Sequence, residues 1–64
     1  LPASVTVVGP VLIEAECEVG EGVTLGPLVY MERGAQVAPG VSLERAVVTR
    51  GVRCSSSISD QILT

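Results

Sequence analysis

The chain has 64 residues, of which 47% are hydrophobic and 2% aromatic, and it carries a formal net charge of −3. This length allows one small domain with a limited core. The negative charge argues against binding to nucleic acid or to an anionic membrane surface, and no apolar run is long enough to span a bilayer. No signal-peptide pattern opens the chain and its two cysteines are too few to define a disulfide framework, so we expect a cytoplasmic protein.

The N-terminal two thirds of the chain repeat with a period of six residues. From Leu1 to Leu43 an aliphatic residue returns at every sixth position, and a small apolar residue precedes each later return by two positions. No helix has this period, and a plain strand has a period of two without a corner. A short strand followed by a tight bend fits, because both apolar positions then point to the same side. The period therefore predicts a coiled β-structure.

Glycine and proline mark the corners of this repeat. All six glycines before residue 44 and all four prolines fall within the three positions that follow an aliphatic return. Corners need unusual or fixed φ angles and can tolerate the loss of a backbone donor. Three sides close one turn, so residues eighteen apart should stack about 4.8 Å apart in parallel strands. The predicted inward columns are Leu1–Val19–Val37, Val7–Leu25–Leu43 and Ile13–Met31.

Beyond Leu43 the repeat continues with shortened sides. The segments 43–48 (LERAVV) and 58–63 (ISDQIL) carry the same pattern fifteen residues apart. The inward columns then extend to Val48, Cys54, Ile58 and Leu63, which makes about three and a half coils of a stacked repeat. Cys17 and Cys54 both point inward as small apolar residues, in coils too far apart for a disulfide.

One outward row of the expected prism is apolar. Most outward strand positions are polar, as expected for residues that face water, but four apolar residues fall on one side. Because a contiguous apolar stripe usually marks a contact surface, we predict that this row is an interface. Its members are Leu12, Tyr30, Val47 and Ile62.

The repeat resembles that of the hexapeptide-repeat proteins, and this resemblance implies a left-handed parallel β-helix, an all-β fold. The stretch GPVLIEAECEVGEGVTLGP with the shortened coils 43–54 and 58–63 is most similar to the C-terminal domain of sugar-phosphate nucleotidyltransferases, although Ala46 stands where that group commonly has serine. The resemblance implies that residues 1–64 form one β-helix domain, the C-terminal part of a longer two-domain protein. Its N-terminal domain would join a nucleoside triphosphate to a sugar 1-phosphate, with release of diphosphate and with Mg²⁺ as cofactor.

We predict no catalytic, cofactor-binding or metal-binding residue within the chain. It has no histidine, which hexapeptide acyltransferases use as a general base and gamma-type carbonic anhydrases use as a metal ligand. Glu14, Glu16, Glu18 and Glu21 are expected to be solvated on the outer surface. We therefore predict a structural and assembly domain that packs on its own catalytic domain, on a second subunit, or on both.

Two alternatives stay open. The chain could be a fragment of a hexapeptide acyltransferase whose catalytic histidine lies outside it. Related β-helices also occur in guanine-exchange subunits of translation initiation, which have the same two-domain organisation but do not carry out the same chemistry.

Overall fold

The computed structural model describes residues 3–64, which form short β-strands and contain no helix that could cross a membrane. Each strand has two or three residues, because corners interrupt the chain every four to six positions. The strands are β1 (Thr6–Val7), β2 (Val11–Ile13), β3 (Glu18–Val19), β4 (Thr24–Leu25), β5 (Val29–Met31), β6 (Gln36–Val37), β7 (Ser42–Glu44), β8 (Ala46–Val48), β9 (Arg53–Cys54), β10 (Ile58–Ser59) and β11 (Ile62–Leu63).

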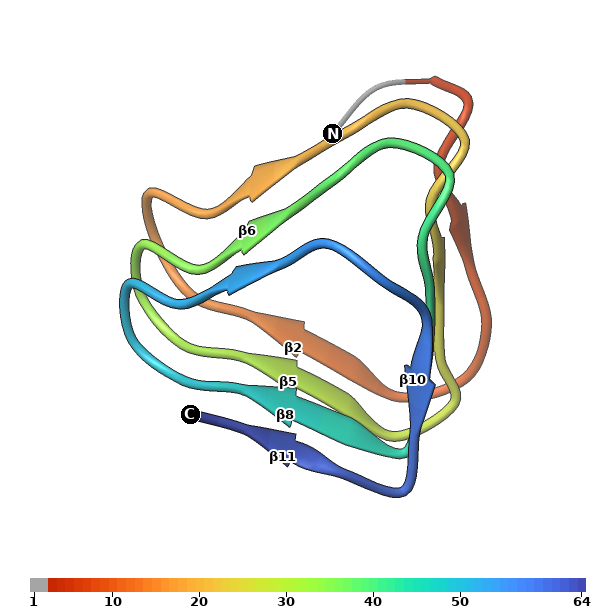
Figure 1. The fold of residues 1–64 in the computed structure, drawn as a ribbon. Helices are drawn as coiled ribbons and strands as arrows, with labels where there is room; N and C mark the ends of the chain where they lie inside the picture. The colour runs from red at the N-terminus through yellow and green to blue at the C-terminus, as the bar shows by residue number, and fades with distance from the viewer. Residues whose placement is uncertain (1–2) are drawn as a thin grey trace.

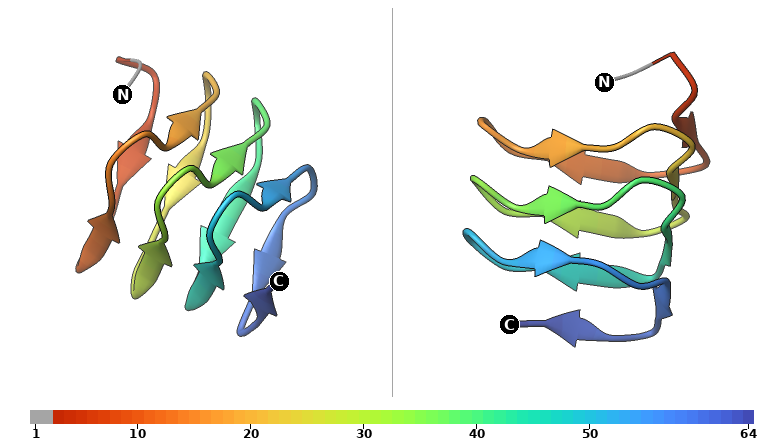
Figure 2. Two further views of the ribbon diagram at one scale, coloured as in Figure 1. Left: turned by 90° about the vertical axis from the view of Figure 1, so that its left-hand side faces the viewer. Right: turned by 45° about the horizontal axis from the view of Figure 1, so that its top comes forward.

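The strands assemble into three parallel sheets that form the sides of a triangular prism (Figure 1). The sheet orders are β1-β4-β7-β10, β11-β8-β5-β2 and β3-β6-β9. Three complete coils and two strands of a fourth stack along the axis, as the side views show (Figure 2). In Figure 1 the chain turns clockwise while its later coils come nearer to the viewer, so the coil is left-handed. The predicted left-handed parallel β-helix is confirmed.

The register of the sheets follows the predicted columns. Leu25 pairs with Val7 on one side and with Leu43 on the other, each eighteen residues away. The shortened coils keep the columns in line, since Leu43 pairs with Ile58 at a spacing of fifteen. Ile13, Met31, Val48 and Leu63 form a second continuous column. The predicted place of Leu1 lies outside the described residues.

The core occupies the middle of the prism. Leu25 and Met31 have no exposed surface, because coils stack on both sides of them. Val7 was predicted to lie inside with Leu25, but 50% of it is exposed, since within the described residues no coil covers the first one. Cys17, in the same first coil, is only half-buried, whereas Cys54 is buried as predicted. The buried hydrophobic residues are Val23, Leu25, Val29, Met31, Ala35, Val37, Val41, Leu43, Ala46, Val48 and Cys54.

Two glycines show why the corners accept so few residue types. Gly26 has a φ of 111°, and a Cβ atom there would lie 1.8 Å from the carbonyl oxygen of Val8 in the coil before. Gly20 has no positive φ, but its Cβ would lie 2.5 Å from the nitrogen of Pro39. Stacked corners therefore exclude side chains by contact between coils as well as by backbone geometry.

Candidate functional site

The three faces of the prism carry different outward side chains. On the sheet β1-β4-β7-β10, Thr6, Thr24 and Ser42 align in register, and we call this the hydroxyl face. On the sheet β3-β6-β9, the outward residues are Glu18, Gln36 and Arg53, and we call this the charged face. Only the third sheet presents an apolar row, so it is the face that water solvates least well.

This apolar face consists of the four residues that the sequence singled out. Leu12 pairs with Tyr30, Tyr30 with Val47, and Val47 with Ile62, so the row crosses all four strands of its sheet. Leu12 is 59% exposed and Ile62 is 68% exposed, while Tyr30 and Val47 are half-buried. The row is thus continuous and accessible, and its role as an interface stays a prediction.

A shallow groove of about 420 Å³ lies beside the N-terminal half of this row. Its walls include Leu28, which the sequence analysis did not select, although 59% of it is exposed. A signal was present, because Leu28 is a large aliphatic residue at the third position after an aliphatic return, where Gly22, Gly34 and Gly40 stand in other coils. The groove is lined by Pro10, Val11, Leu12, Leu28, Val29 and Tyr30.

Glutamate side chains stabilise the opposite edge of the apolar face. The Tyr30 hydroxyl donates a hydrogen bond to Glu14 Oε2, and the Arg33 amide donates to Glu14 Oε1 at 2.9 Å. One coil later, the Arg50 amide donates to Glu32 Oε1, also at 2.9 Å. Each carboxylate therefore caps a corner amide of the following coil, which is a structural role.

These contacts move two pKa values. The hydrogen bond from Tyr30, followed by that from the Arg33 amide, lowers the pKa of Glu14 below its ordinary 4.5. The same hydrogen bond raises the pKa of Tyr30 above its ordinary 10.0, because it favours the protonated hydroxyl beside a carboxylate.

We expect the stabilisation from Glu14 to depend on pH. Because its pKa is lower in the folded state, ionised Glu14 favours folding above pH 4.5, and this contribution disappears as the pH falls through the folded pKa. Glu14→Gln should unfold at a lower urea concentration than the unchanged chain at pH 7, and the gap should narrow as the pH falls below 4.5. Glu21→Gln is the matched control, since the Glu21 carboxylate makes no hydrogen bond within residues 3–64. Equal pH dependence in both variants would rule out this role.

The last two coils are joined by an ion pair at a corner. Arg45 binds Asp60 through Nε at 2.5 Å and Nη2 at 2.9 Å, and Nη2 also donates to Glu44 Oε1 at 3.2 Å. This pair raises the pKa of Arg45 above its usual range and lowers the pKa of Asp60 below its usual range. The corner charges within this pair therefore neutralise one another.

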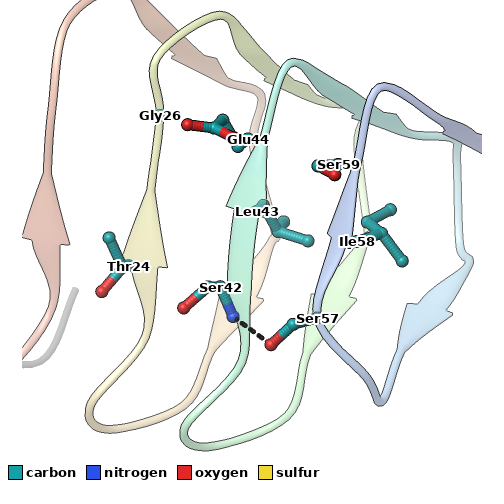
Figure 3. Close-up of a pocket in the computed structure, with 8 residues that line it drawn as sticks. All are labelled: Thr24, Gly26, Ser42, Leu43, Glu44, Ser57, Ile58 and Ser59. Carbon is teal, nitrogen blue, oxygen red and sulfur yellow. Dashed lines mark hydrogen bonds between the residues drawn. The ribbon is translucent and has the colours of Figure 1, made fainter.

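A second pocket, of about 350 Å³, opens on the hydroxyl face (Figure 3). Thr24 in β4, Ser42 in β7 and Ser57 directly before β10 lie side by side there, and the Ser42 amide donates a hydrogen bond to Ser57 Oγ at 2.9 Å. Among the residues that line this pocket, Glu44 is the one that could act as a base for a hydroxyl nucleophile, and its carboxylate already accepts a hydrogen bond from Arg45. Among residues 3–64, no group of three or more His, Cys, Asp and Glu side chains is placed to hold a metal ion.

Comparison with known proteins gives two relatives, both from plants. A probable mannose-1-phosphate guanylyltransferase 3 of Oryza sativa subsp. japonica is 41% identical over 59 residues, which are 89% of this chain and 16% of the relative. Mannose-1-phosphate guanylyltransferase 1 of Arabidopsis thaliana is 43% identical over 56 residues, which are 81% of this chain and 16% of the relative. The chain thus spans about one sixth of the length of these relatives. No family model and no solved structure matches the chain.

Proposed function

We propose that this chain is the non-catalytic β-helix part of a sugar-phosphate nucleotidyltransferase. Its two relatives confirm the resemblance to that family. The observation that carries the proposal is an identity of 41–43% along most of the β-helix. The names of the relatives suggest the reaction of the whole protein. It would transfer a guanylyl group from GTP to mannose 1-phosphate, forming GDP-mannose and diphosphate.

The chemistry would take place in an N-terminal catalytic domain that precedes residues 1–64. The absence of histidine from the chain supports this division. The glutamates support it too, because the carboxylates of Glu14 and Glu32 accept hydrogen bonds from backbone amides and that of Glu16 binds the Arg33 side chain. These carboxylates do not fit a Mg²⁺ site, because their oxygens already accept hydrogen bonds from the next coil. The Mg²⁺ that nucleotidyl transfer typically requires would bind in the catalytic domain.

The β-helix would serve assembly in a cytoplasmic enzyme. Its apolar face offers a contact surface for the catalytic domain, for a second subunit, or for both. The acyltransferase alternative would require a histidine from outside the chain, and the two guanylyltransferase relatives favour the nucleotidyltransferase.

We expect activity in the full-length protein and none in the 64-residue chain. The full-length protein should release diphosphate from GTP only when mannose 1-phosphate is present. The purified chain should transfer neither nucleotidyl nor acyl groups, since it lacks a base with a partner nucleophile. Turnover by the chain that survives repeated purification would contradict the proposal, and so would acyl transfer without nucleotidyl transfer by the full-length protein.

A further inference from the structure

Arg50 is an exposed arginine at the rim of the apolar face, and its charge is not paired. Its side chain lines a pocket of about 270 Å³ together with Glu14, Tyr30, Glu32 and Arg33. Within residues 3–64 the Arg50 guanidinium makes no ion pair, whereas the Arg33 side chain binds a glutamate of the coil before. A free positive charge therefore lies directly beside the apolar row.

Glu32 is the matching acid on the same rim, one coil before Arg50. Its Oε1 atom accepts a hydrogen bond from the Arg50 amide at 2.9 Å, and its Oε2 atom accepts none within the described residues. The Glu32 carboxylate makes no ion pair in that part of the chain either. The rim thus carries an unpaired carboxylate in the coil of Tyr30 and an unpaired guanidinium in the coil of Val47.

We propose that the apolar face binds the apolar face of a second copy of this chain, with the two coil axes antiparallel. The inference rests on the proposed function, and it names the partner of the contact face. A two-fold axis along the strands, between β5 and β8, places the N-terminal coils of one copy against the C-terminal coils of the other. Tyr30 then faces Val47 of the second copy. Leu12 faces Ile62 of the second copy, so each row covers the other completely.

The charges at the rim favour this orientation over the alternative. The same two-fold axis brings Arg50 to the rim position of Glu32 of the second copy, and symmetry forms this contact twice. A two-fold axis along the coil would instead set Arg50 against Arg45 of the second copy. That arginine has the same charge and is already bound to Asp60 and Glu44. Opposite charges across a contact therefore select the antiparallel arrangement.

The size of the face fits a contact between two copies. The chain exposes 3635 Å², divided over three faces and two ends, so one face offers roughly a fifth of that area. Specific contacts between separate proteins bury about 800 Å² on each partner, which this face approaches. Leu12 and Ile62 are 59% and 68% exposed, and covering them removes the most apolar surface from water. A second copy supplies both this cover and the opposite charges.

Photochemical cross-linking in the full-length protein tests the orientation. Leu12, an exposed residue, is replaced by p-benzoylphenylalanine, and the irradiated protein is separated on a denaturing gel. We expect a covalent dimer of twice the polypeptide mass, in which residue 12 is joined to the peptide that contains Ile62. Thr24 on the hydroxyl face is the matched control and should give no covalent dimer. A link from residue 12 to residue 12, links only to a segment outside the β-helix, or no link would overturn the inference.

Charge variants test the rim contact independently. Arg50→Glu should weaken self-association of the full-length protein about tenfold or more, since two ion pairs become two repulsions. Arg53→Glu is the matched control, because Arg53 is also an exposed arginine of the third coil but lies on the charged face. Sedimentation equilibrium measures both variants, and equal dissociation constants would refute the antiparallel contact.

These experiments do not depend on catalysis, so they separate this inference from the proposed function. If the unchanged full-length protein transfers the nucleotidyl group but position 12 gives no covalent dimer, this inference alone fails. If position 12 gives the expected dimer but the unchanged protein shows no nucleotidyl transfer, the proposed function fails.

Discussion

Replacing Leu25 with alanine is expected to lower the free energy of unfolding of the 64-residue chain by about 2–5 kcal/mol. Leu25 has no exposed surface and is stacked between Val7 and Leu43 in adjacent coils. Parallel sheets on three sides fix the distance between coils, so the cavity left by the missing atoms cannot close easily. Since small domains are stable by only about 5–15 kcal/mol, this substitution removes a large share of the total stability.

Urea unfolding of the two chains measures this effect, and the next residue supplies the control. Thr24 lies in the same strand but points outward on the hydroxyl face, half-buried. Thr24→Ala should therefore change the free energy of unfolding by less than about 1 kcal/mol. A comparable loss in the two variants would show that the alternation of inward and outward residues in β4 is wrong.

The double variant Tyr30→Glu and Val47→Glu is expected to abolish the contact of the apolar face in the full-length protein. Both side chains are outward and adjacent in register, so the fold should remain. A carboxylate that is buried without a partner costs several kcal/mol, which corresponds to binding on the order of 100-fold weaker or more. Light scattering would show the loss of assembled mass, and faster proteolysis would show the loss of a contact within one polypeptide.

Two controls keep this prediction specific. Tyr30 lies beside Glu14, so a glutamate there could act by local repulsion alone, and the variant Tyr30→Lys with Val47→Lys removes that explanation. Thr24→Glu and Gln36→Glu add charge to the hydroxyl and charged faces and should leave assembly unchanged. Native assembly of both double variants, with an unchanged circular dichroism spectrum, would exclude the apolar face as an interface.

Most of the architecture could be predicted from the sequence because the contacts of a coiled repeat are periodic. Leu25 meets Leu43 and Tyr30 meets Val47 at spacings set by the number of residues in one turn. A pattern along the chain therefore maps directly onto columns in space. Glycine and proline residues such as Gly26 and Pro27 showed where along the chain the corners lie. The apolar row followed from the same count, since an outward residue is simply the neighbour of an inward one. Handedness did not follow from spacing and came from the resemblance.

Only the tertiary structure decided how residues at equivalent positions of the repeat differ in burial and in side-chain contacts. Val7 and Leu25 hold equivalent positions, yet one is half exposed and the other fully buried, because burial depends on coils on both sides. The contact of Glu14 with Tyr30 and the Arg33 amide joins residues from two coils at a corner, where side chains follow no regular direction. Leu28 became notable only through its left-handed backbone and its place beside the groove. Repetition determines which strands pair, whereas the corners and the ends of the prism depend on neighbours that a period does not specify.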